Sequence, residues 1–286
     1  MLMNIPNILF CRRCAARVVQ RRALNLQEYQ SKSLLRAHGC AVQNFFVAEN
    51  PSEAKTKLQN TDFAEYVVKA QILAGGRGKG RIIGSLRNLS GIFTSSAKNE
   101  ILENVRDMFN KRLVTKQTDA KGVVVKKVMI AESISIARET YLAILMDRMY
   151  NGPVIVASPA GGMDIETIAV TQPELILKEP IAIDLGIRPA QCEKIARFLQ
   201  FPDEMLDTVV AQIRALYMLF VKVDATQIEI NPLAQTSDKK VYCVDAKFNV
   251  DDNAAFRQEA IFSLENDEEA VNNIKYCFVT NFISLE

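Results

Sequence analysis

A lysine inside an apolar stretch, followed directly by a glycine-rich loop, is the first feature of this chain that points to chemistry. The sequence VVKAQILAGGRGKGRIIG, residues 67–84, places Lys69 among β-branched residues and then brings Gly76, Arg77 and Gly78. A buried lysine is costly unless an anion meets it, and glycine lets successive backbone amides approach a phosphate closely. A phosphate loop, a plain mobile hairpin and an RNA-binding patch are the three interpretations.

The loop matches neither of the two common nucleotide-binding motifs. Walker A requires Ser or Thr after Gly-Lys, and Lys79 is followed by Gly80. The dinucleotide fingerprint requires glycine where this chain has Arg81. RNA binding is disfavoured because no aromatic residue is interleaved with the positive charges, so the spacing leaves a phosphate loop and a mobile hairpin open.

A second group of polar residues lies in DATQIEINPLAQTSDKKVYCVDAKFN, residues 224–249. Alternation along an extended chain places Glu229 and Asn231 on one face of a strand, and Asp245 and Lys247 on one face of the returning strand. If the two strands pair as a hairpin, the side chains of Glu229, Asn231 and Asp245 converge. Carboxylate and amide oxygens hold Mg²⁺ against nucleotide phosphates, whereas a solvated polar face is the alternative.

Glu132 and Glu139 lie on or beside predicted strands and are candidates for contact with a ribose or a base edge. Surface charges without a ligand are the alternative interpretation of both. The glycine turn at residues 158–166 is ambiguous by itself.

Histidine and cysteine usage excludes several classes of site. The single histidine, His38, rules out a centre with several imidazoles in this chain and leaves little room for a Ser-His-Asp hydrolase. We expect it in the last turn of a helix, where a cation complements the helix dipole. The six cysteines show no second pair at zinc spacing, so we expect reduced thiols; they are Cys11, Cys14, Cys40, Cys192, Cys243 and Cys277.

Composition and charge bound the class of protein. The 286 residues are 49% hydrophobic, enough for one or two domains. No apolar run approaches the ~18 residues that span a bilayer. The net charge is +2, but five arginines precede the first acidic residue, and without them 30 basic residues face 33 acidic ones, a net of −3. The body of the chain is therefore no general nucleic-acid binder.

The first 22 residues, MLMNIPNILFCRRCAARVVQRR, are apolar, rich in arginine and free of acid. This pattern predicts a mitochondrial transit segment. A disordered basic tail is the alternative, and a secretory signal fits less well because the arginines follow the apolar residues.

The elements that would position these residues alternate between helical and extended patterns. Asn25 and Glu28 stand in an N-cap to N3 relationship, which predicts a helix that ends before Gly39. Further helices are predicted at 53–58, 98–109, 189–198 and 203–221. Strands are predicted at 42–48, 66–72, 123–132, 139–147, 154–158, 227–233 and 240–249. The fold class is thus α+β (mixed α/β) with antiparallel hairpins, too irregular for a doubly wound sheet.

Several blocks together resemble the β subunits of succinyl-CoA synthetases (succinate–CoA ligases) of mitochondrial type. The likeness runs from about residue 24 to 262 and is carried by LNLQEYQSKSLL, VVKAQILAGGRGKG, LVTKQTDAKGV, RETYLAILMDR, GPVIVASPAGGMDIE and IEINPL with VDAKFN. The resemblance implies an ATP-grasp fold, in which two small α+β lobes clamp a nucleotide. An ATP-grasp ligase of the citrate-lyase type fits these blocks less well.

The resemblance also implies a reaction and a partner. The family interconverts succinyl-CoA, phosphate and a nucleoside diphosphate with succinate, CoA and the triphosphate, in the tricarboxylic acid cycle of the mitochondrial matrix. A phosphohistidine on an α subunit carries the phosphoryl group, and His38 does not match it. A heterodimer, a nucleotide and Mg²⁺ are therefore expected, with no nucleic acid or membrane as partner.

Matching motif by motif carries the family's site residues onto this chain. Asn231 and Asp245 would bind Mg²⁺, and Glu229 would orient the incoming phosphohistidine as the catalytic residue. The implied nucleotide-binding residues are Gln43, Lys69, Gly76, Arg77, Gly78, Glu132, Ile134 and Glu139. Gln43 stands where the guanine-using branch has glutamine and the adenine-using branch has proline, so GDP/GTP is favoured over ADP/ATP.

The chain departs from the family pattern in two places. After Gly80 it has RIIGSLRNLSGIF in place of a glycine-rich segment, which predicts a longer far arm of the loop. Near its end IKYCFVTNFISLE replaces the start of the family's flavodoxin-like domain, which is expected to be absent. The expected organisation is a transit segment at 1–22, an ATP-grasp domain at 23–265 and a truncated tail at 266–286. A truncated, non-catalytic paralogue that binds nucleotide or the α subunit without turnover is the alternative function.

Overall fold

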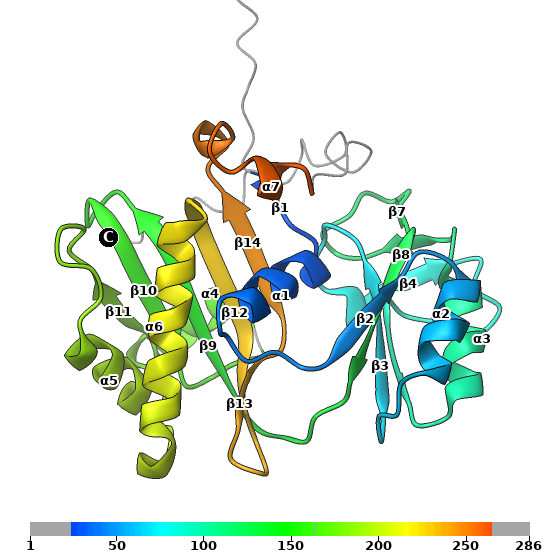
Figure 1. Cartoon of the computed structure of the whole chain (residues 1–286), viewed down its shortest axis with the longest axis horizontal. Coiled ribbons are helices and arrows are strands. Elements are labelled where there is room, and N and C mark those ends of the chain that lie inside the picture. Colours follow the sequence, from blue (N-terminus) through cyan, green and yellow to red (C-terminus); the bar gives the residue numbers. More distant parts are fainter. Residues whose placement is uncertain (1–23, 163, 265–286) are drawn as a thin grey trace, which may run out of the picture.

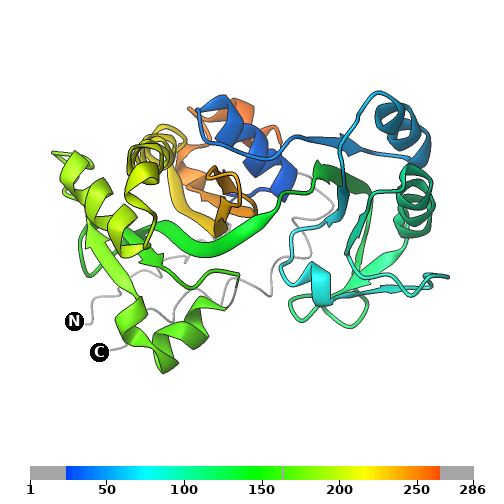
Figure 2. The same ribbon diagram turned by 90° about the horizontal axis from the view of Figure 1, so that it is seen from below.

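The computed structural model of the chain describes residues 24–162 and 164–264. The predicted transit segment at 1–22 and the tail at 266–286 lie outside the described residues. The described chain forms two lobes that lie side by side (Figures 1 and 2). Within this part of the chain, none of the helices has the length and apolar character needed to cross a membrane.

The larger lobe is built on a seven-stranded sheet of order β1-β14-β12-β9-β10-β11, with β13 paired to β12 off this path. Every described pair is antiparallel. The strands are β1 (Leu24–Asn25), β9 (Ile136–Asp147), β10 (Gly152–Ser158), β11 (Leu177–Pro180), β12 (Ala225–Thr236), β13 (Val241–Cys243) and β14 (Ala246–Val250). Alternation sends Leu142 and Ile144 into the main apolar core, and Tyr141 and Ala143 into a smaller cluster on the other face.

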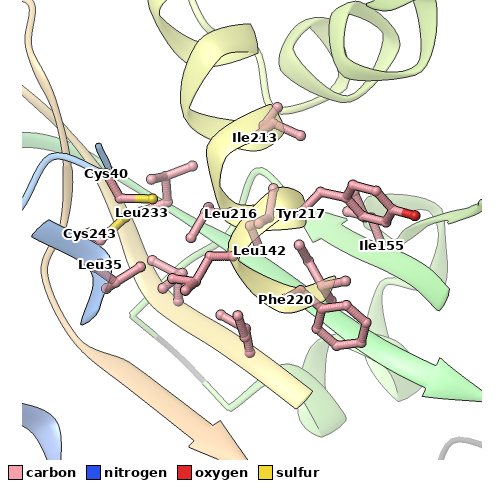
Figure 3. Packing of buried hydrophobic residues seen from close by; sticks show 14 of the residues in the cluster. Leu35, Cys40, Leu142, Ile155, Ile213, Leu216, Tyr217, Phe220, Leu233 and Cys243 are labelled. Carbon is pink, nitrogen blue, oxygen red and sulfur yellow. The ribbon is translucent and has the colours of Figure 1, made fainter. Parts of the chain in front are cut away.

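Helices cover both faces of this sheet. The main core is closed by α1 (Glu28–Ala37), α5 (Pro189–Phe198) and α6 (Leu206–Lys222), with α7 (Glu259–Phe262) at its edge. Figure 3 shows Leu35 of α1 together with Leu216 and Phe220 of α6 in this core. On the opposite face, α4 (Ile165–Thr171) packs Ile165 against the smaller cluster. Short 3₁₀ turns stand at η2 (Pro173–Leu175), η3 (Asp203–Met205) and η4 (Asp252–Ala254).

The smaller lobe has its own sheet and its own apolar core. Four strands, in the order β2-β8-β3-β5, are covered by α2 (Pro51–Gln59) and α3 (Lys98–Met108), and a three-stranded sheet of order β4-β6-β7 completes the lobe (Figure 1). Its strands are β2 (Phe45–Ala48), β3 (Tyr66–Gln71), β4 (Arg81–Ile83), β5 (Ile92–Ser95), β6 (Arg112–Val114), β7 (Val123–Val124) and β8 (Lys127–Glu132). The cores of the two lobes have no residue in common.

The first helix begins differently from the sequence prediction. Its N-cap is Gln27, whose backbone N–H donates to Oε1 of Gln30 at 2.8 Å, so the predicted pair of Asn25 and Glu28 is wrong as a cap. Asn25 is held instead in β1, opposite Asn249 of β14. The predicted end of the helix is confirmed: Gly39 follows with φ +79°, which favours glycine.

His38 lies at the end of the first helix, as expected. It is the C-cap of α1, and its Nδ1 lies 2.8 Å from the carbonyl oxygen of Leu34. Among the described cysteines, Cys40, Cys192 and Cys243 are free and buried. Burial raises the pKa of the Cys40 thiol to about 12.

Most predicted strands are confirmed, but two of them are broken. The predicted strand at 123–132 divides into β7 and β8, which belong to different sheets. The predicted strand at 240–249 divides into β13 and β14, which leaves Asp245 between them. Further elements of the structure were not predicted from the sequence: β1, β4, β5, β6, β11, α4 and α7. The far arm of the glycine loop, in particular, is β4, a turn and β5.

Candidate functional site

Glu28, at the start of α1, is the centre of a buried ion-pair cluster between the two lobes. Its Oε1 lies 2.8 Å from Nζ of Lys69 and 3.4 Å from Nζ of Lys32, and its Oε2 lies 2.6 Å from a terminal nitrogen of Arg77. The side chains of Glu28, Lys32, Lys69 and Arg77 are 3%, 0%, 8% and 6% exposed. The buried lysine of β3 therefore meets an anion, and in this structure that anion is a carboxylate of the chain itself.

Electrostatics in the cluster keep Glu28 ionised. Burial by itself raises the pKa of Glu28, but the charges of Lys69, Arg77 and Lys32 outweigh burial and hold this pKa well below its ordinary value. Burial lowers the pKa of Lys32 to about 8, against the opposing charge of Glu28. With Asp245 included, three cations face two carboxylates. The excess positive charge favours an additional anion at this place.

The glycine loop is folded back onto the lobe. Gly76, with φ +70°, begins the 3₁₀ turn η1 (Arg77–Lys79). The buried guanidinium of Arg77 donates to the carbonyl oxygen of Ala70 in β3 at 2.9 Å. The backbone N–H of Gly75 donates to Oε1 of Gln117 at 2.6 Å. The loop is thus attached to the small lobe through the buried side chain of Arg77 and the backbone of Gly75, which a plain hairpin would not require.

The two predicted Mg²⁺ ligands lie next to each other in the large lobe, Asn231 in β12 and Asp245 between β13 and β14. The backbone N–H of Asn231 donates to the carbonyl oxygen of Asp245 at 3.1 Å, so the two residues pair across the hairpin, and the convergence of their side chains stays a prediction. The carboxylate of Asp245 is 34% exposed and lies 3.4 Å from Arg77. Oδ1 of Asn231 accepts a hydrogen bond from the backbone N–H of Gly162 at 2.7 Å.

This donor set fits a cation held mainly by phosphate oxygens. Within residues 24–162 and 164–264, no group of three or more His, Cys, Asp or Glu residues stands close enough to hold a metal ion alone. Mg²⁺ is usually bound by one or two carboxylates, substrate phosphates and water. Asp245 and Asn231 could supply the protein share of such a site.

Glu229 lies on the same hairpin, among other charged groups. It stands opposite Lys247, whose Nζ lies 3.0 Å from its Oε1, and Gln227 donates to its Oε2 at 3.3 Å. A neighbouring carboxyl, Glu166 of α4, has a raised pKa, chiefly through its hydrogen bond with Asp164, then through burial and the charges of Asp164 and Glu229. Glu229 thus has a fixed orientation beside a locally acidic surface.

The remaining predicted nucleotide residues fall into two places. Gln43 is buried; its Nε2 donates to the carbonyl oxygen of Glu132 at 3.2 Å, and its Oε1 accepts from Lys32 at 2.7 Å. Gln43 and Glu132 therefore adjoin the ion-pair cluster. Ile134 lies half-buried in the linker between β8 and β9.

Glu139, in contrast, lies beside the glycine turn after β10. Its carbonyl oxygen accepts from the backbone N–H of Gly161 at 3.1 Å, and a Cβ on Gly162 would lie 1.8 Å from its Oε2. Because Gly162 also contacts Asn231, the structure puts Glu139 near the predicted metal ligands. The structure brings Glu132 to the cluster and Glu139 to this turn.

Replacing Gly161 by alanine is expected to destabilise the fold by about 1–3 kcal/mol. The added Cβ would lie 2.5 Å from backbone atoms of Thr140, so the turn or β9 has to shift. Gly78→Ala is the control, since its Cβ would make an ordinary 3.6 Å contact with Ile92 and cost under about 1 kcal/mol. Urea denaturation measures both variants, and equal stability of Gly161→Ala and the unchanged chain would contradict the close approach.

Comparison with known proteins places this geometry in a family. The sequence matches the ATP-grasp domain family over residues 25–235. It is 56% identical over 250 residues to the mitochondrial succinate–CoA ligase [GDP-forming] subunit beta of Caenorhabditis elegans, covering 87% of this chain and 60% of that protein. The human protein of the same name is 45% identical over 283 residues, covering 98% and 65%. The [ADP-forming] subunit beta of Dictyostelium discoideum is 41% identical, covering 99% and 64%.

The chain thus spans about three fifths to two thirds of the length of these relatives. Among solved structures, an ATP citrate lyase from Methanothrix soehngenii matches with a TM-score of 0.60 at 18% identity, covering 85% of this chain and 55% of that one. PH1788 from Pyrococcus horikoshii matches with a TM-score of 0.54 at 16% identity, covering 80% and 92%. These likenesses support the fold.

Proposed function

Because this chain belongs to the ATP-grasp domain family, we propose that it is the nucleotide-binding β subunit of a mitochondrial succinate–CoA ligase. It would bind a Mg²⁺ complex of GDP or GTP in the matrix and exchange a phosphoryl group with a phosphohistidine of an α subunit. The names of its relatives support this assignment, since the GDP-forming ones reach the higher identities.

The observation that carries the proposal is the position of Arg77. Its guanidinium contacts Glu28, in the cluster that also holds Lys69, and it lies 3.4 Å from Asp245 of the hairpin. Residues 168 positions apart, predicted separately as a phosphate contact and a metal ligand, are therefore direct neighbours. A polyphosphate bound beside this pair would meet the cations Lys69 and Arg77 and, next to them, the metal ligands of the hairpin.

Each of these residues would have its own role in phosphoryl transfer. Lys69 and Arg77 would bind and orient phosphate oxygens, and the backbone amides of the glycine loop would add hydrogen bonds. Asp245 and Asn231 would hold Mg²⁺, which neutralises charge on the transferring group when bound. Glu229, held by Lys247 and Gln227, would orient the phosphohistidine. Gln43 would distinguish guanine from adenine through its amide.

Calorimetry with the full chain tests the first part of the proposal. We expect a saturable heat of binding for GDP with Mg²⁺ and a weaker one for ADP. No binding of either nucleotide at millimolar concentration would overturn the proposal. In a second experiment, the chain is mixed with a phosphorylated α subunit and GDP, and formation of GTP is measured. Binding of GDP without transfer would favour a nucleotide-binding protein that lacks turnover.

A further inference from the structure

The contacts of Glu28 join parts of the molecule that have separate apolar cores. Glu28 belongs to α1, which packs on the large lobe through Leu35, whereas Lys69 lies in β3 of the small lobe and Arg77 in its glycine loop. A second polar contact runs beside it, since the backbone N–H of Tyr29 donates to Oε1 of Gln71 at 3.1 Å. The position of the two cations relative to the large lobe therefore depends on the first turn of α1.

Each oxygen of Glu28 takes one of the cations. Oε1 accepts from Lys69 at 2.8 Å, and Oε2 accepts from Arg77 at 2.6 Å. One rigid carboxylate thus sets the spacing between the ammonium and the guanidinium. The contacts leave donor capacity on both, because an ammonium has three N–H donors and a guanidinium five. Lys69 donates one hydrogen bond to Glu28, and Arg77 donates one each to Glu28, Ala70 and Asp245.

Stability alone is a weak explanation for this cluster. A buried ion pair contributes no more than well-packed apolar residues of similar volume, because desolvation offsets the attraction. The cluster also carries one positive charge too many, with Lys32, Lys69 and Arg77 against Glu28 and Asp245. An unbalanced buried charge is a cost that an incoming anion removes.

We propose that Glu28 is a positioning residue of the nucleotide site, which holds Lys69 and Arg77 at the spacing that two phosphate groups require. Glu28 acts through the two cations and does not itself touch the nucleotide. The inference rests on the proposed function, because Lys69 and Arg77 must be phosphate contacts. It predicts that changes at Glu28 alter the part of the affinity that comes from the phosphates, and leave the part that comes from the base.

The test compares guanosine and GDP as ligands of the full chain and of two variants, by calorimetry or by competition with a fluorescent GDP analogue. Glu28→Gln keeps the size of the side chain, but its amide nitrogen repels one of the two cations. We expect the ratio of the guanosine Kd to the GDP Kd to fall about tenfold, the loss of roughly one charge-assisted hydrogen bond. Guanosine itself should bind as before.

Glu28→Asp keeps the charge on a shorter side chain. Its ratio of the guanosine Kd to the GDP Kd should lie between those of Glu28→Gln and the unchanged chain. It also serves if Glu28→Gln fails to fold, as judged by circular dichroism. Glu193→Gln is the matched control: this exposed glutamate of α5 forms a surface ion pair with Arg197, and its loss should leave the ratio unchanged.

The outcomes distinguish a failure of the proposed function from a failure of the positioning role of Glu28. If the unchanged chain does not bind GDP, the proposed function fails. If it binds GDP and Glu28→Gln folds with an unchanged ratio, the positioning role is overturned. Equal losses for guanosine and GDP would indicate a purely structural residue. Tighter binding of GDP by Glu28→Gln would indicate a carboxylate that competes with phosphate, and would overturn it as well. If Glu28→Gln does not fold, an unchanged ratio in Glu28→Asp overturns it.

Discussion

Asp245→Ala is expected to weaken binding of GDP in the presence of Mg²⁺ by at least about tenfold, as loss of a metal ligand does. The carboxylate is the only charged member of the predicted metal pair, and the amide oxygen of Asn231 is a weaker donor alone. In EDTA the same substitution should not weaken binding of GDP, because without Mg²⁺ Asp245 is an anion next to phosphates and its removal relieves repulsion. Calorimetry with and without Mg²⁺ measures both quantities.

Asp238→Ala is the control for this experiment. Asp238 lies at the far tip of the same hairpin, where it pairs with Lys240 and accepts a hydrogen bond from Thr236. Both changes remove an aspartate from one hairpin, but only Asp245 adjoins Arg77. If Asp245→Ala retained its full Mg²⁺-dependent affinity, Asp245 would not be a metal ligand.

Glu28→Ala is expected to lower the free energy of unfolding by about 3–5 kcal/mol, the range found when one partner of a buried ion pair is removed. Three buried or nearly buried cations would lose their common carboxylate. Since domains are stable by only about 5–15 kcal/mol, the variant would unfold at much lower urea concentration. Glu193→Ala, at an exposed pair, should cost under about 1 kcal/mol.

The loss caused by Glu28→Ala should also depend on pH. The pKa of Glu28 is held below its ordinary value of 4.5 in the folded chain, so the folded state keeps the carboxylate ionised where the unfolded state binds a proton. Its contribution is complete above that ordinary value and is lost as the pH falls below it. Urea unfolding of the unchanged chain and of Glu28→Ala is measured between pH 7 and pH 4. The difference between their free energies of unfolding should become smaller below pH 4.5. A difference in free energy of unfolding that becomes larger on acidification would contradict the ion-pair assignment.

Sequence patterns of short range predicted much of the fold. The bounds of α5 agree with prediction because Pro189 and the apolar period are local signals. The hairpin that brings Asn231 beside Asp245 could be predicted for the same reason, since strand alternation and a polar turn specify such a pairing. The resemblance of several blocks in one order predicted the ATP-grasp family, which the comparison confirmed.

The tertiary structure decided what surrounds the charged residues. Lys69 was expected to need an anion, but its partner Glu28 lies 41 positions away, and the sequence pattern assigned Glu28 only to the start of a helix. Arg77 reaches Asp245 across 168 positions. No spacing rule links such residues, because they belong to two lobes and meet only when both lobes have folded. The sequence by itself thus determined the family, the longer helices and the candidate ligands. Only the folded chain determined that one buried carboxylate joins the predicted phosphate contacts.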